Sequence, residues 1–132
     1  MYYAWNFILA ADQTEATKTK EELYLEKGTI TRTEIIFPVG CANLVFVHLD
    51  DSLHQVWPKS PEYKFVGDGA HIVCNDEYEI KEPPFTIQFH GWNTDEIYDH
   101  TITIRIQIVP VKEILHKVIG EVMKYTKLSR PN

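Results

Sequence analysis

The chain has 132 residues, of which 44% are hydrophobic and 24% charged, a size and composition typical of one globular domain. The formal net charge of -6, with scattered basic residues, argues against a nucleic-acid-binding groove. No apolar stretch approaches the roughly 20 residues of a membrane helix. We therefore expect neither nucleic acid nor a membrane as a partner.

The N-terminus begins with an alternating pattern. Apolar and aromatic residues alternate with others over residues 2–9, which predicts a strand or an extended arm. The polar stretch 11–22 predicts a loop, so an N-terminal arm would cover about residues 1–22. No signal peptide is evident, and we expect synthesis in a reducing cytoplasm. Cys41 and Cys74 are then expected to be free, buried thiols, although sequence leaves their pairing open.

The body of the chain is dominated by strand patterns. β-branched residues and period-two alternation recur between glycine and proline turn signals about every ten residues. This spacing predicts an all-β fold, a jelly-roll-like β-sandwich of about 8 antiparallel strands. The clearest predicted strands after the arm are 29–37, 44–49, 54–57, 71–74, 77–80, 85–89 and 102–109.

The C-terminal segment follows a different period. Apolar residues recur there at spacings of three and four, which predicts an amphipathic helix over about 111–127. Gly120 weakens that helix by about 1 kcal/mol relative to alanine. The predicted organisation is therefore a β-sandwich domain, residues 1–110, followed by a C-terminal helix and tail, residues 111–132.

The side chains that could bind a metal or act in catalysis do not have the spacing that such sites require. His48, Asp50, Asp51 and His54 lie close in sequence but match no zinc pattern, so we interpret them as a turn flanked by polar strand residues. Neither a Gly-x-Ser-x-Gly elbow nor a Gly-rich phosphate loop occurs. We expect no catalytic residue, no cofactor and no metal, and hence no enzyme.

Two alternatives stay open. A carbohydrate- or receptor-binding module would combine exposed aromatic residues with the acidic loop 93–100, because loops at the ends of sandwiches often bind ligands. A cupin-like enzyme would instead need His48, His90 and His100 to converge on a metal inside the barrel. The candidate ligand-binding residues for the first alternative are Trp57, Trp92, Asp95, Tyr98 and Asp99.

Both ends of the chain are candidate interfaces. Chain ends fray unless they are tied down, and aromatic residues are enriched in interface cores, so an apolar N-terminal strand and a C-terminal apolar stripe both need a partner surface. Docking of residues 2–9 as an ordinary first strand is an equally good interpretation. The candidate interface residues are Tyr2, Tyr3, Trp5, Phe7, Ile114, Leu115, Val118 and Val122.

Several blocks together resemble a known class of proteins. They are Glu34-Ile-Ile-Phe-Pro-Val-Gly-Cys-Ala-Asn-Leu-Val, Gln55-Val-Trp-Pro, Gly67-Asp-Gly, and Gly91-Trp-Asn followed by Tyr98-Asp-His-Thr-Ile-Thr-Ile. Over about residues 2–110 the chain resembles jelly-roll accessory proteins of tailed phages and related viruses, which are decoration, cement or vertex subunits. The resemblance implies a non-enzymatic virion component that is made in the host cytoplasm. It also implies a symmetric oligomer, a trimer or a pentamer, bound to the major capsid protein or another virion protein.

Overall fold

Eight strands make up most of the described chain. The computed structural model describes residues 1–111, so the helix predicted over 111–127 lies, apart from its first residue, outside the described residues. A 3-10 turn, Glu15–Thr17, separates the first two strands. The strands are β1 (Tyr2–Leu9), β2 (Thr19–Tyr24), β3 (Gly28–Phe37), β4 (Val45–Asp51), β5 (His54–Trp57), β6 (Ala70–Ile80), β7 (Thr86–Asn93) and β8 (His100–Pro110).

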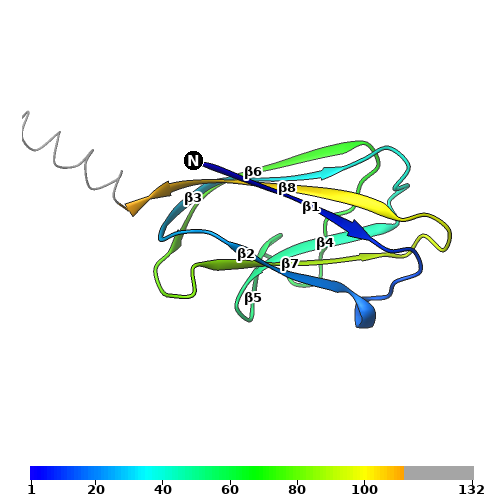
Figure 1. Cartoon of the computed structure of the whole chain (residues 1–132), viewed down its shortest axis with the longest axis horizontal. Helices are drawn as coiled ribbons and strands as arrows, with labels where there is room; N and C mark the ends of the chain where they lie inside the picture. Colours follow the sequence, from blue (N-terminus) through cyan, green and yellow to red (C-terminus); the bar gives the residue numbers. More distant parts are fainter. Residues whose placement is uncertain (112–132) are drawn as a thin grey trace, which may run out of the picture.

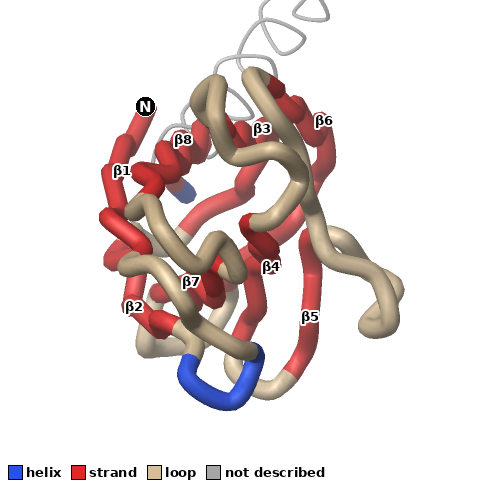
Figure 2. The backbone as a smooth tube through the Cα atoms, turned by 90° about the vertical axis from the view of Figure 1, so that its right-hand side faces the viewer, coloured by secondary structure: helices blue, strands red, loops and turns tan. Residues whose placement is uncertain are grey.

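The strands form two antiparallel four-stranded sheets, which lie in two layers (Figure 1). The first sheet has the order β1-β8-β3-β6 and the second the order β2-β7-β4-β5. The view turned by 90° shows the first sheet above the second, with loops running across the near end (Figure 2). The expected all-β fold with about eight antiparallel strands in two sheets is confirmed.

The core lies between the sheets because side chains alternate along each strand. In β8, Ile102, Ile104, Ile106 and Ile108 are fully buried, whereas the residues between them are half-buried or exposed. The opposing sheet contributes Val47, Leu49, Ile87 and Phe89 to the same cluster. The period-two pattern therefore selects which face of each sheet is buried.

Both cysteines are free thiols that contact this core. Cys41 is buried, as expected, whereas Cys74 is only half-buried at the inner face of the edge strand β6. Burial raises the pKa of each thiol, which keeps it protonated at neutral pH. They act as small packing residues.

Several strand boundaries differ from the sequence prediction: β7 continues past residue 89 to Asn93, β8 starts at His100, and two larger differences lie at sheet edges. The predicted strands 71–74 and 77–80 are one continuous strand, β6, opposite a register shift in β3 between Ile30 and Arg32. The polar stretch 11–22 contains the start of β2, which pairs with β7 from Thr19 onward. An edge strand keeps much of its surface in water, so polar residues there did not signal a strand.

We predict that Ile104→Ala lowers the free energy of unfolding by about 2–5 kcal/mol, because it leaves a cavity in a site with no exposure. Arg105→Ala, on the exposed face of the same strand, is the matched control and should change it by less than about 0.5 kcal/mol. Urea denaturation followed by tryptophan fluorescence measures both. Equal losses in the two variants would contradict the assigned register.

Candidate functional site

The N-terminal strand is attached to its own sheet. β1 pairs antiparallel with β8 along its full length and forms one edge of the first sheet. Tyr3, Trp5 and Phe7 face inward and pack against the core, with the Phe7 ring stacked on Phe89 at a centroid distance of 4.4 Å. The Tyr3 hydroxyl donates a hydrogen bond of 2.9 Å to Glu26. Three of the four aromatic residues proposed for an interface are therefore partly used within the chain.

The rest of the candidate interface is distributed differently. Tyr2 lies on the outer face of β1 and is 57% exposed, and Ile8 on the same face is 72% exposed. The C-terminal candidates, Ile114, Leu115, Val118 and Val122, lie outside the described residues. The accessible part of the N-terminal candidate surface is thus the outer face and the free edge of β1.

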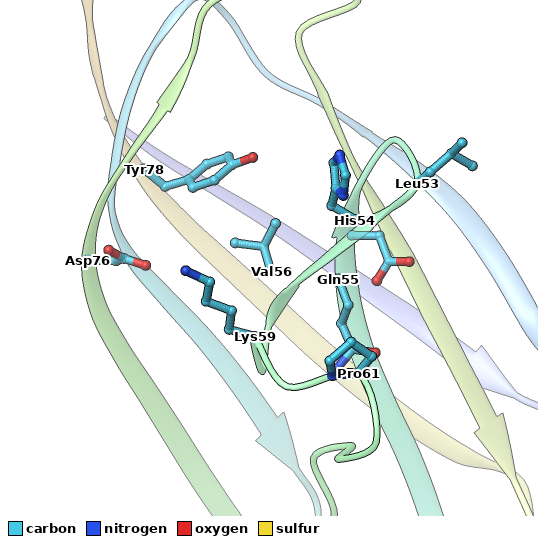
Figure 3. A pocket seen from close by; sticks show the side chains of 9 residues that line it. Leu53, His54, Gln55, Val56, Lys59, Pro61, Asp76 and Tyr78 are labelled. Carbon is cyan, nitrogen blue, oxygen red and sulfur yellow. The ribbon is translucent and has the colours of Figure 1, made fainter.

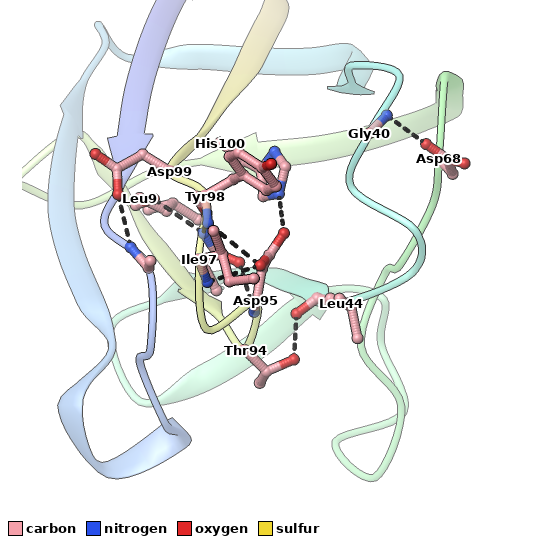
Figure 4. A network of polar contacts seen from close by, with 12 residues as sticks. Leu9, Gly40, Leu44, Asp68, Thr94, Asp95, Ile97, Tyr98, Asp99 and His100 are labelled. Carbon is pink, nitrogen blue, oxygen red and sulfur yellow. Dashed lines mark hydrogen bonds and ion pairs between the residues drawn. The ribbon is translucent and has the colours of Figure 1, made fainter.

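The acidic loop between β7 and β8 is held by its own polar groups (Figure 4). Asp95 Oδ1 accepts hydrogen bonds from the backbone N–H groups of Ile97 at 2.9 Å and Tyr98 at 3.2 Å. Its other oxygen lies 2.9 Å from Nε2 of His100. The bond from Ile97, followed by that from His100, lowers the pKa of Asp95, so its carboxylate is ionised and already coordinated by hydrogen-bond donors.

Further bonds tie this loop to the N-terminal segment. Asn93 Nδ2 donates to the carbonyl oxygens of Leu9 at 3.2 Å and Tyr98 at 2.8 Å, and Asp99 accepts a bond of 2.8 Å from the Ala11 N–H. Asn93 and Asp99 therefore hold the end of β1 against the β7–β8 loop, whereas Asp95 holds the loop itself and its contact with His100. The carboxylate oxygens of Asp95 and Asp99 serve a structural role in the described residues.

The two tryptophans proposed for ligand binding lie on opposite faces of the second sheet. Trp57 is 3% exposed in the core, with its ring edge-on to Tyr78 at 5.4 Å. Trp92 is 6% exposed on the outer face, stacked on Phe46 at 5.3 Å. The structure therefore does not bring the aromatic and acidic candidates together on one surface; of the five, only Tyr98, at 65%, and Asp99 are exposed.

A histidine cluster occupies the outer face of the second sheet. His48 on β4 and His90 on β7 are register partners, and their rings stack at 4.5 Å with an interplanar angle of 8°. Asp50 reaches both imidazoles, at 2.6 Å from His48 Nδ1 and 3.5 Å from His90 Nε2. Lys18 Nζ lies 3.5 Å from His48 Nε2 and covers the Trp92 ring at 5.8 Å.

This cluster differs from the cupin-like arrangement. His48 and His90 lie outside the sheet, and His100 is bound to Asp95 in the β7–β8 loop, so the three histidines do not converge inside the sandwich. Within residues 1–111 no group of three or more His, Cys, Asp or Glu side chains is placed to hold a metal ion. In the sequence, His48 and His90 each alternate with inward-facing residues and are thus placed on the outer face of their strands. The strand register makes them neighbours.

Burial governs the charge state of the cluster. It lowers the pKa of His48 and, more strongly, that of His90 to about 4, while Asp50 opposes the shift in both. Nδ1 of His90 is buried and has no hydrogen-bond partner among the described residues. The imidazoles are therefore neutral at pH 7 and pack as a polar stack beneath Lys18.

An open groove of about 700 Å³ lies beside the β4–β5 hairpin (Figure 3). Lys59 and Asp76 lie on its walls, and Tyr78 closes one end, where its hydroxyl donates to Asp51 at 2.5 Å. Burial, together with that carboxylate, raises the pKa of Tyr78 to about 12, so the phenol stays protonated. The groove is lined by one lysine, Lys59, and two carboxylates, Asp50 and Asp76.

Comparisons with protein-family models and with curated protein sequences find no match to this chain. In residues 1–111 no helix is long and apolar enough to cross a membrane.

We predict that acid weakens the fold through the histidine pair. Unfolding returns each imidazole to a pKa near 6.5, whereas His90 in the folded chain protonates near 4, so the unfolded chain binds more protons between these values. The free energy of unfolding should fall by about 1–3 kcal/mol as the pH decreases from 6.5 to 4. Urea denaturation at a series of pH values measures this loss.

The variant His90→Gln keeps a neutral polar group and should show a shallower pH dependence over the same range. His54→Gln, which replaces an exposed histidine of β5, is the control and should run parallel to the wild type. If the wild type and His90→Gln have the same slope, the histidine pair does not cause the acid sensitivity.

Proposed function

We propose that this chain is a non-enzymatic structural subunit of a virus particle, a decoration, cement or vertex protein of a tailed phage or related virus. The observation that carries the proposal is the order of the strands. β1 lies beside β8, β2 beside β7, β3 beside β6 and β4 beside β5, an order that agrees with a jelly roll of two Greek keys. The resemblance of the sequence blocks to jelly-roll virion proteins agrees with that winding.

Jelly rolls also occur in lectins and cupins, so the surface has to favour one of these functions. A lectin-like site is disfavoured by the burial of Trp57 and Trp92 and by the hydrogen bonds that occupy Asp95. A cupin-like centre is disfavoured by the position of His48 and His90 outside the sheet. An assembly role requires neither site and agrees with the exposed apolar residues of β1.

The proposed subunit works by contact with copies of itself and with a capsid or other virion protein. Closed symmetry is the usual way in which such subunits bury apolar surface, and a trimer or a pentamer suits sites on a capsid. The apolar stripe of the C-terminal segment, including Leu115 and Val118, is part of the proposed contact.

The direct test is the composition of purified particles. Peptide mass spectrometry of gradient-purified virions from the source virus should detect this chain, and deletion of its gene should remove density at one defined position in cryo-electron microscopy maps. Absence of the chain from particles that retain all other structural proteins would contradict the proposed function.

A second prediction concerns the C-terminal stripe. Leu115→Asp combined with Val118→Asp places two charges in a surface that we expect to be buried between chains, so light scattering should give a smaller assembly. Lys117→Asp, between them on the polar side of the predicted helix, is the matched control and should keep the wild-type mass. An unchanged mass in the double variant would exclude this stripe from the interface.

A further inference from the structure

The four edges of the two sheets are not equally protected. An edge strand exposes unpaired N–H and C=O groups, and proteins usually protect them with charges, bulges or short strands. β2 and β6 both carry several charged residues, and β5 has only four residues and is followed by Pro58. β1 has eight residues and contains neither a charge nor a proline. Its edge is therefore the one that remains open to another strand.

The backbone groups on that edge are defined by the pairing with β8. The Ile108 N–H donates to the Met1 carbonyl at 2.9 Å, and β1 then runs antiparallel to β8 without a register shift. In such a ladder every second residue turns both its N–H and its C=O toward the neighbouring strand, and the residues between them turn theirs away. The residues that present free groups are Tyr2, Ala4, Asn6 and Ile8, and none of these groups has a partner within residues 1–111.

We propose that β1 pairs with β1 of a second copy of this chain, antiparallel and around a twofold axis at Trp5. In this register Tyr2 lies opposite Ile8 of the copy and Ala4 opposite Asn6 of the copy. All four residues with free backbone groups then meet one another, and each pair exchanges two hydrogen bonds. A shift of the register by two residues leaves some of these groups without a partner.

The side chains fit the same register. On the outer face, the exposed Tyr2 and Ile8 cover each other across the axis, which removes apolar surface from water on both copies. On the inner face, Trp5 meets Trp5 of the copy, and Tyr3 meets Phe7 of the copy. Because β1 carries no charge, pairing with itself brings no like charges together.

The contact is isologous, and it joins the two β1-β8-β3-β6 sheets into one continuous sheet. Strand addition of this kind derives its affinity from main-chain hydrogen bonds and its specificity from the facing side chains. The inference deepens the proposed function, on which it rests for its use in a virion. The contact gives a dimer by itself and connects two rings if the subunits also form a trimer or a pentamer.

The test uses two double variants of the full chain at the same positions. Ala4→Lys with Asn6→Lys places like charges directly opposite each other across the axis, and dimerisation should weaken by about tenfold or more. Ala4→Lys with Asn6→Glu places opposite charges across the axis and should keep the wild-type assembly. Sedimentation velocity should give an even number of chains for the wild type and half that mass for the lysine variant, and thermal unfolding verifies that each variant is folded.

Amide hydrogen exchange of the wild type tests the register without substitution. The N–H groups of Tyr2, Ala4, Asn6 and Ile8 should be protected in the assembly and become exchangeable on dilution to the monomer. A wild type that stays monomeric, equal masses for both double variants, or protection of these amides in a monomer would each overturn the proposal. Absence of the chain from virions would contradict the proposed function and leave the dimer measurement unaffected.

Discussion

The structure depends on β8 and its row of isoleucines. This strand pairs with β1 on one side and with β3 on the other, so it joins two N-terminal strands to the end of the described chain. Its buried side chains meet those of β7 and β4 from the opposing sheet. Most of the contacts in the fold are therefore long-range in sequence, and each sheet combines strands from both halves of the described chain.

Polar groups secure the ends of this β scaffold. Asp95 binds backbone N–H groups of the exposed β7–β8 loop, and Asn93 gives the buried carbonyl oxygen of Leu9 at the end of β1 a hydrogen-bond donor. The histidine pair on the second sheet is the opposite case, because burial keeps it neutral and leaves Nδ1 of His90 without a partner among the described residues. The hydrogen bonds of Asp95 and Asn93 stabilise the fold at any pH above the acid range, whereas the pair of His48 and His90 makes the fold sensitive to mild acid.

The positions of unpaired backbone groups and exposed apolar side chains in this chain agree with a function that depends on assembly. The inner faces of both sheets are filled, and the acidic loop is bound to itself. On β1, free backbone hydrogen-bonding groups lie next to exposed apolar side chains, and the strand carries no charged residue. A protein that acts through its edges needs a rigid two-layer body and no cavity of defined chemistry, and β1 presents its open edge on such a body.

Local sequence patterns predict the all-β class, the inward-facing residues of β1, β7 and β8 and the positions of most turns, because period-two alternation and glycine or proline signals are local properties. They predicted residues 29–37 and 54–57 within one residue of β3 and β5. They missed the start of β2 and divided β6, since edge strands are only partly buried and keep polar residues. The contact between His48 and His90 and the free edge of β1 become visible in the folded chain alone. Both features depend on which strands become neighbours, and local periodicity does not determine the pairing between segments that are distant in sequence.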